Sequence, residues 1–349
     1  MKLDLKKPEF RLTRPAWMET LSRPPGEVWG LLKDRLTKKQ SAGMAGLYAT
    51  GEGVGLVHVV PGQDHRMRLN VCAFQPLTKG QSPGKIAQGM IKSHKLEKAP
   101  YVGVLDRTTY LLLPAEAPDL PREEWSTAMK WRVKDQVGFP VSQAVVETFD
   151  MPGNTPDSDS GRIYVAVAKE VDVRKQVQLF HEAGVALHAL DIHELALINL
   201  TRHLPEDAEG MALLHLEAKS GLVIMIKNGC FYLSRRIETG LSALMDSLGP
   251  DGSGIAQAPY MDRVALEAQR TMDYFESHFG QSPASSLYVA PLPVPVEGLR
   301  PALAERLGMR IRFLPAEEIL EIPEGVPEEN IARALLVIGA AMGRSHTPP

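Results

Sequence analysis

The stretch MALLHLEAKSGLVIMIKNGCFYLSRRIETG, at residues 211–240, decides the fold of this chain. It contains three apolar runs separated by two short polar turns. The second turn is Asn228-Gly229, and Asn-Gly between apolar runs is the strongest short signal for a β-hairpin. The sequence therefore predicts a β-meander with strands over Met211–Leu216, Leu222–Ile226 and Cys230–Ser234.

A second Gly-punctuated meander is predicted near the start of the chain, over residues 46–75. Alternating helix and strand segments follow each meander, with helices expected at 83–98, 194–203, 239–248, 261–279, 299–307 and 328–342. Two halves that open alike and continue into α/β units predict a duplicated α/β fold with a cleft between the halves.

Residues 120–182 form a distinct α+β block within the first half. Trp125, Met129, Val133 and Val137 recur at helical spacing, and strands AVVETFD and IYVAVAK follow, with a polar loop between them. The block closes with a helix over Asp172–Ala183, for which Asp172 is the expected N-cap and Gly184 the terminating glycine.

Composition describes an ordinary soluble globular protein. Of 349 residues, 44% are apolar and 23% charged, and the net charge of −3 predicts no attraction to nucleic acid. Both cysteines, Cys72 and Cys230, lie in apolar runs, which predicts two buried free thiols. The longest apolar run, near Ala334–Met342, is shorter than the ~20 residues that a membrane helix needs. We expect a cytoplasmic protein.

Residues 1–43 differ from the rest, because they are rich in Lys, Arg and Pro around a few aromatic residues. Two interpretations of this basic N-terminal extension stay open. It is either a solvated tail or an arm that docks on a partner or a membrane surface, since Trp17 and Trp29 suit an interface.

Five segments together resemble a known family: GEGVGLVHVV at 51–60, EEWSTAMKWRVKDQVGFPVSQAVVETFDMP at 123–152, VAVAKEVDVRKQVQLFHEAGVALHALDIHELALINL at 165–200, DRVALEAQRTMDYFESHFGQSPASSLYVAP at 262–291 and IARALLVIGAAMGR at 331–344. In this order they resemble the PilM-type actin-like proteins of type IV pilus assembly. The variant that they resemble most is the MshI type from mannose-sensitive haemagglutinin (MSHA) pilus systems.

The resemblance implies a duplicated actin-like fold of the RNase H-like (ASKHA) class, with an inserted α+β, SHS2-like subdomain. It implies one domain over 44–203 that carries the insert at about 106–188, and a second domain over 204–349. It also implies a PilN-like inner-membrane partner within a pilus assembly complex. The protein is then expected in the cytoplasm, held at the inner membrane of a Gram-negative bacterium through that partner.

Actin-like ATPases bind phosphate at two turns, and the first is altered here. The family pattern Gly-Ile-Asp-Ile-Gly aligns with residues 46–50, so Tyr48 replaces the acidic residue. Gly51 and Gly53 still predict a small nest of backbone amides. Glu52 between them is either solvent-exposed or a metal carboxylate.

The second turn keeps more of its chemistry, because the resemblance places Glu217 at the acidic position. Lys219, Ser220 and Gly221 follow it and are candidates to meet a phosphate, although a charged strand end explains them equally well. A Gly-Gly loop is expected after the strand LYVAP, and Pro291–Pro295 stands there instead. Prolines lack N–H donors and prevent the close approach that glycines allow.

We therefore expect no catalytic residues and no ATP hydrolysis. A residual nucleotide site, with ATP and magnesium as its only candidate ligands, would consist of the two turns above and Gly339 in the last helix. The sequence predicts no metal site, because His193 and His203 are too far apart for an i,i+4 pair. Trp131 lies off the apolar line of its helix and either seals the insert or contacts a partner.

Three functions compete at this point. The leading hypothesis is a non-catalytic scaffold of an MSHA-type pilus machine, which binds an extended segment of a PilN-like protein in a groove beside the insert. The second is an active ATPase, or a sugar-kinase-like enzyme, of the same fold. The third is a cytoplasmic component of a type II secretion system, similar to GspL.

Overall fold

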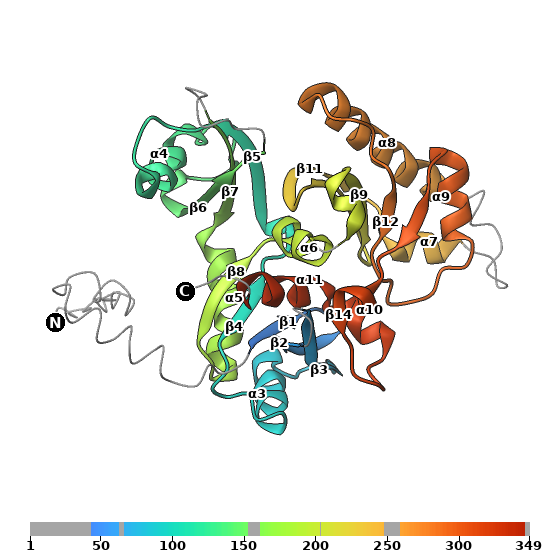
Figure 1. Ribbon diagram of the computed structural model, residues 1–349. Coiled ribbons are helices and arrows are strands. Elements are labelled where there is room, and N and C mark those ends of the chain that lie inside the picture. The colour runs from blue at the N-terminus through green and yellow to red at the C-terminus, as the bar shows by residue number, and fades with distance from the viewer. Residues whose placement is uncertain (1–42, 63–65, 153–160, 203, 248–258, 346–349) are drawn as a thin grey trace. The chain divides into compact units, whose positions relative to one another are not determined.

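The meander at residues 211–240 forms as predicted in a computed structural model of the chain, which describes residues 43–62, 66–152, 161–202, 204–247 and 259–345. Its strands are β9 (Met211–Leu216), β10 (Gly221–Lys227) and β11 (Cys230–Ile237) (Figure 1). Asn228 and Gly229 have φ angles of 51° and 66°, and a type I′ turn requires both to be positive. Strands β12 (Leu287–Val289) and β13 (Ile311–Phe313) extend this sheet in the order β11-β10-β9-β12-β13.

The predicted N-terminal meander also forms and lies in a second, six-stranded sheet. The order is β14-β3-β2-β1-β4-β8, where β1 is Met44–Ala49, β2 is Gly53–Pro61, β3 is Met67–Pro76, β4 is Tyr101–Val104 and β8 is Leu187–Asp191. Strand β14 (Leu320–Glu321), which the sequence did not predict, comes from the C-terminal part of the chain and pairs in parallel with β3.

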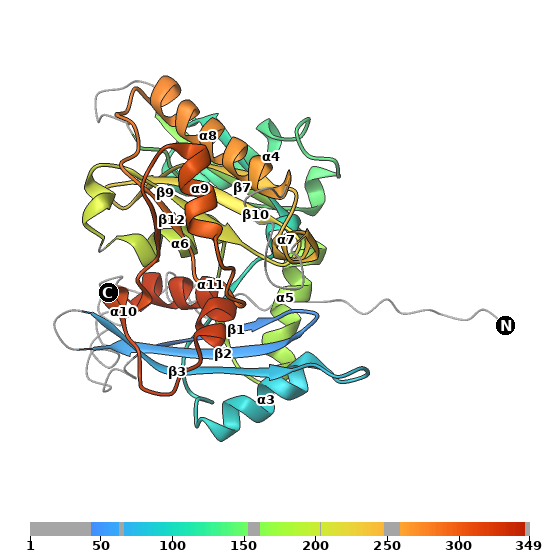
Figure 2. The same cartoon turned by 90° about the vertical axis from the view of Figure 1, so that its right-hand side faces the viewer.

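Helices pack on both faces of this six-stranded sheet (Figure 2). Helices α3 (Pro83–Ser93) and α5 (Glu170–Ala183) share one core with the first strands. Helix α11 (Glu328–Ser345) packs on the other face, and helix α6 (His193–Thr201) packs on α11 and contacts β11 of the five-stranded sheet. The core on that face includes Leu213 and Ile224 of the five-stranded sheet, so one apolar cluster joins the two sheets.

The predicted α+β block forms a small third sheet in the order β5-β7-β6. Its strands are β5 (Tyr110–Glu116), β6 (Ala144–Asp150) and β7 (Arg162–Lys169). Helix α4 (Trp125–Arg132) is shorter than the spacing suggested, yet Met129, Val133 and Val137 are all buried in one cluster against β6 and β7. The apolar residues continue at helical spacing into the turns after the helix, so their spacing predicted a helix longer than α4.

The N-cap predicted for α5 was wrong. The helix begins at Glu170, and Lys169 is its N-cap residue. Asp172 lies in the first turn instead, where its carboxylate pairs with Lys175 at 3.0 Å and a negative charge favours the helix dipole. Gly184 ends the helix with φ of 75°, as predicted.

Helices α7 (Leu241–Ser247), α8 (Pro259–Phe279) and α9 (Leu299–Leu307) follow the second meander near their predicted positions. A short helix α10 (Ala316–Ile319) precedes β14, and a 3-10 turn, Pro205–Ala208, precedes β9. The division into domains at residues 44–203 and 204–349 stays a prediction. Across it, β14 and α11 pack on the first sheet.

Burial of the cysteines was predicted incorrectly. Cys72 is half-buried in β3, and Cys230 is exposed because it is the first residue after the Asn228-Gly229 turn. Among the described residues, no helix is long and apolar enough to cross a membrane. The predictions for the extension up to Ala42, and for the polar loops over residues 153–160 and 248–258, lie outside the described residues.

Candidate functional site

The structure brings together the two turns and the proline run around one cavity of about 290 Å³. Glu52 of the first turn, Ala218 of the second, Pro293 of the proline run and Arg333 of α11 all line it. Helix α7 contributes Leu241, Ser242, Met245 and Asp246, and Val294 and Val296 complete the lining. Its volume lies just below the usual range for ligand pockets, roughly 300–1,000 Å³.

Arg333 crosses from α11 to the first turn. Its guanidinium makes an ion pair with Glu52 and a second, at 2.7 Å, with Glu329, and lies 4.8 Å above the ring of Phe74. Glu52 is solvent-exposed, which was one of the two roles that the sequence left open for it, and its partner is a protein cation. The Glu52 carboxylate is therefore already paired with Arg333, whereas a metal ion would need it as a ligand.

Two of the backbone amides in the first turn are already used within the turn. The Thr50 amide donates to the Gly53 carbonyl at 2.8 Å, and the Glu52 amide donates to the Thr50 hydroxyl at 3.2 Å. Gly51 is exposed and Gly53 begins β2 beside Phe74. This turn is closed on itself and offers a weaker amide nest than the glycines suggested.

The second turn is held from outside by the N-terminus of α7. The amides of Leu241 and Ser242 donate to the carbonyls of Glu217 and Ala218, at 2.8 and 2.9 Å. A Cβ at Gly240 would lie 2.3 Å from the Glu217 carbonyl oxygen, so only glycine permits this close contact. These two amides, which a phosphate would otherwise attract, bind the turn itself.

The remaining predicted nucleotide residues have separate surroundings. Lys219 is exposed, and Gly221 starts β10 next to Leu216. Gly339 lies in the contact between α11 and α6, where a Cβ would come within 2.1 Å of the Ala196 carbonyl oxygen. Gly339 therefore allows the two helices to pack closely. The residual nucleotide site as a whole stays a prediction.

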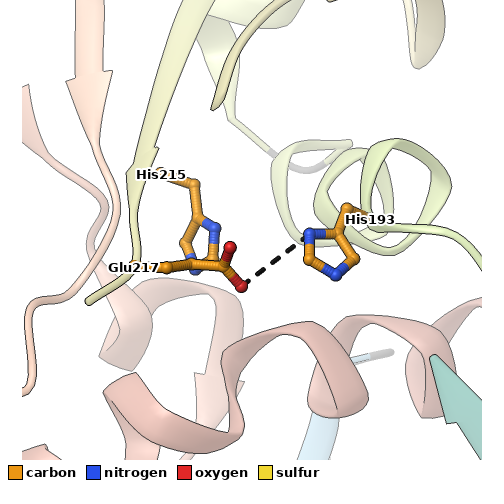
Figure 3. Close-up of side chains that lie close together, drawn as sticks. All are labelled: His193, His215 and Glu217. Atoms are coloured by element: carbon orange, nitrogen blue, oxygen red, sulfur yellow. Dashed lines mark ion pairs between the residues drawn. The ribbon is translucent and has the colours of Figure 1, made fainter. Parts of the chain in front are cut away.

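A cluster that the sequence did not predict lies beside Glu217. Nitrogens of His193 and His215 and an oxygen of Glu217 lie within 4.8 Å of one another (Figure 3). His193 is the first residue of α6, His215 belongs to β9, and Glu217 lies two residues after His215, directly after the end of that strand. Residues i and i+2 of a strand share a face, and this face of β9 is the one that points toward α6. Sequence reasoning compared histidines only with their chain neighbours and missed His215.

Burial controls the charge of this cluster. Loss of hydration lowers the pKa of His193 to about 3 and that of His215 to about 4, so both imidazoles are neutral near pH 7. Burial also raises the pKa of Glu217, although the Ser220 hydroxyl, which donates to Oε2 at 3.2 Å, opposes that rise. The other oxygen, Oε1, lies 3.9 Å from Nδ1 of His193.

The next residue of α6, Glu194, is a fully buried carboxylate. Oε2 accepts a hydrogen bond from the Tyr110 hydroxyl at 2.5 Å, and Oε1 accepts one from the Ser234 hydroxyl at 3.1 Å. Arg107 completes its surroundings, with Nε 3.1 Å from Oε1. Residues from β5, β11 and the turn before β5 therefore meet at the start of α6.

An apolar groove of about 490 Å³, here called the insert groove, lies between the insert and the first sheet. Its walls include residues of β6 and of β8, each of which is an edge strand of its own sheet. Val145 and Glu147 of β6 face the groove, while Ala144 and Val146 face α4. The lining is mostly apolar: Leu105, Tyr110, Val145, Phe149, Ala166, Val167, Ala168, Val173, Ala189, Leu190, Ile192 and Leu195.

The insert groove continues into a second hollow of about 630 Å³. Phe149, Asp191 and Leu195 line both, and Cys230 and Arg202 border only the second. An open edge strand offers backbone N–H and C=O groups to an added strand. The arrangement therefore suits an extended peptide with alternating apolar side chains.

Trp131, the predicted partner contact, does not line the insert groove. It is 65% exposed on α4, the helix that covers the opposite face of the insert sheet. Its exposure disfavours a sealing role, and its contact with a partner stays a prediction.

Comparison with known proteins identifies the fold. No family model matches the chain, and no curated protein matches it. A chain of a solved PilM-PilN type IV pilus biogenesis complex aligns with a TM-score of 0.71 and 20% identity, over 87% of this chain and 99% of that one. The predicted actin-like fold with an inserted α+β subdomain is confirmed.

Two other solved structures align with lower scores. A protein of unknown function with an actin-like ATPase fold, from Bacteroides thetaiotaomicron, has a TM-score of 0.47 and 7% identity over 85% of this chain and 96% of its own. The second is the cytoplasmic domain of EpsL, an inner membrane component of the type II secretion system of Vibrio cholerae. It has a TM-score of 0.46 and 11% identity, over 85% of this chain and 94% of its own.

Proposed function

We propose that this protein is a non-catalytic scaffold of a type IV pilus assembly machine of the MSHA type. In this role it binds the cytoplasmic segment of a PilN-like inner-membrane protein and resides in the cytoplasm, at the inner membrane of a Gram-negative bacterium. The fold shared with a chain of the PilM-PilN complex supports this proposal. The observation that carries it is the insert groove, with edge strands β6 and β8 in its walls.

The groove has the chemistry that an extended peptide needs. Main-chain hydrogen bonds to an edge strand supply affinity, and pockets for alternate side chains supply specificity. Val145, 36% exposed, offers an apolar contact on β6 without belonging to the core under α4. Glu147 and Thr148 border the same wall and favour a peptide with a polar or basic residue at that register.

Peptide binding tests this proposal. The probe is a synthetic peptide with the N-terminal cytoplasmic sequence of the PilN-like protein from the same genome, titrated into the full chain by calorimetry. We expect binding that Val145→Arg weakens at least tenfold and Leu266→Arg leaves unchanged. Leu266 is the matched control, because it is an exposed apolar residue of α8 outside the groove. A folded protein that ignores the peptide, or a Val145→Arg variant that binds it normally, would overturn the assignment.

The variant Trp131→Ala, measured in the same titration, tests whether Trp131 contacts the partner. A loss of affinity supports the predicted contact on α4, whereas unchanged affinity confines recognition to the groove. We also propose the division into two domains between residues 203 and 204. The cavity near Arg333 is lined by residues from both sides of that division.

The absence of ATP hydrolysis is part of the proposal. It is supported by the Arg333–Glu52 pair and by the use of the α7 amides within the second turn. Calorimetry with Mg-ATP is expected to give no measurable binding. Binding tighter than about 10 μM that Glu217→Ala abolishes would favour the ATPase alternative.

A further inference from the structure

We infer that His193, His215 and Glu217 form a binding site for a divalent transition-metal ion of the zinc class. The site joins α6 of the first half of the chain to β9 of the second. Its existence is independent of the proposed pilus function and of any nucleotide.

The spacing of the three ligand atoms suits one ion. Atoms that all lie within 4.8 Å of one another share a point no more than about 2.8 Å from each, by plane geometry. Zinc bonds to imidazole nitrogen and carboxylate oxygen measure about 2.0–2.2 Å, so each side chain must approach by less than about 1 Å. Rotation of the Glu217 side chain, which is partly exposed, supplies much of that movement.

The donor set selects the kind of metal. Two neutral imidazoles and one carboxylate are the protein ligands of many catalytic zinc sites, and imidazole suits zinc, copper, iron and nickel. Magnesium prefers oxygen ligands, so a nucleotide-bound Mg²⁺ would gain little from two histidines. Three protein ligands leave a fourth position for water or another ligand.

Neighbouring groups orient the ligands in the way that metal sites need. Ser220 donates to Oε2 of Glu217. The other oxygen, Oε1, is directed at His193 (Figure 3). A hydrogen bond with the backbone of Leu105 holds the imidazole of His193. Such outer partners fix ring orientation and strengthen ligands. The charges nearest the cluster are mixed, with Asp106 favouring a cation and Arg107 and Arg236 opposing it.

Metal binding to the full chain tests the inference. The protein is stripped with a chelator, dialysed, and titrated with Zn²⁺ or Co²⁺, with Mg²⁺ in a parallel sample. We expect one equivalent of Zn²⁺, a visible Co²⁺ absorption typical of four-coordinate nitrogen and oxygen ligation, and no Mg²⁺ binding of comparable affinity.

Variants locate the ion. His193→Gln, His215→Gln and Glu217→Gln are each expected to weaken Zn²⁺ binding by more than about 100-fold, and Ser220→Ala by about 10-fold. His188→Gln is the matched control, because His188 is exposed on β8 outside the cluster, and it should leave binding unchanged. Circular dichroism separates loss of metal from loss of fold, and Ser220→Ala tests the site without altering a buried ligand.

Two results would overturn the inference. One is a folded protein that binds no stoichiometric Zn²⁺. The other is Zn²⁺ affinity that survives in the folded ligand variants or falls equally in His188→Gln, which would place the ion elsewhere and leave the cluster as ordinary packing of two aromatic rings.

Discussion

The hydroxyl of Tyr110 donates a 2.5 Å hydrogen bond to Oε2 of Glu194, a carboxylate with no exposed surface. Tyr110 begins the insert sheet, and Glu194 lies in the first turn of α6. Ser234 of the five-stranded sheet binds the other oxygen of the same carboxylate. One side chain of α6 therefore ties the insert to the five-stranded sheet, beside both the insert groove and the histidine cluster.

Replacement of Glu194 by alanine should destabilise the protein strongly. The change leaves Arg107, Tyr110 and Ser234 without their shared acceptor, and breaking a buried ion pair typically costs about 3–5 kcal/mol. Chemical denaturation measures the effect. Glu170→Ala is the control, since its pair with Arg174 on the surface of α5 is worth less than about 0.5 kcal/mol. Equal losses of unfolding free energy in the two variants would show that the buried network stabilises the protein no more than a surface ion pair does.

Alanine at Gly339 should destabilise the contact between α11 and α6. The new Cβ would lie 2.1 Å from the Ala196 carbonyl oxygen, a backbone atom that cannot move alone, and overpacking of this kind costs about 1–3 kcal/mol or more. Gly89 in α3 is the matched helical glycine, with no atom within 4 Å of its Cβ position. Gly89→Ala should instead stabilise the protein by up to about 1 kcal/mol. Thermal melts that rank the variants in the opposite order would refute this packing.

The Asn228-Gly229 turn should require its glycine. Gly229 has φ of 66°, and an L-residue in this region costs about 1–2 kcal/mol, so Gly229→Ala should lower the stability by that amount. Gly138→Ala, at an exposed position with no neighbour within 4 Å, should stay within about 0.5 kcal/mol of the parent. Urea denaturation of both variants decides the point.

The two cysteines should differ sharply in reactivity. Burial raises the pKa of Cys72 to about 12, and the thiolate is the reactive form, whereas Cys230 is exposed at the start of β11. A chromogenic disulfide reagent at pH 8 should modify one thiol rapidly in the native protein. Cys230→Ser should abolish the rapid phase and Cys72→Ser should preserve it; the reverse pattern would contradict the structure.

Modification of Cys230 also bears on the proposed partner. Cys230 borders the hollow that continues the insert groove, so a bulky maleimide at this position should weaken peptide binding. Cys230→Ser treated with the same reagent should bind the peptide normally. An effect that persists in the serine variant would place the interference elsewhere.

Several elements were predictable because their signals are local. The Asn228-Gly229 turn, the alternating apolar runs of both meanders and the glycine at the end of α5 each act within a few residues. The helix α4 and the N-cap of α5 were predicted less accurately, because an apolar period does not mark where a helix begins or ends.

By itself, the sequence determined the two meanders, the order of the insert and most of the helices. Tertiary structure alone decided that β14 joins β3, that Arg333 reaches Glu52, and that His193 meets His215 and Glu217. These pairs join residues far apart in the chain, and nothing in their local sequence favours one distant partner over another. Packing of α6 and α11 between the two sheets brings them together, because one shared apolar core is buried there.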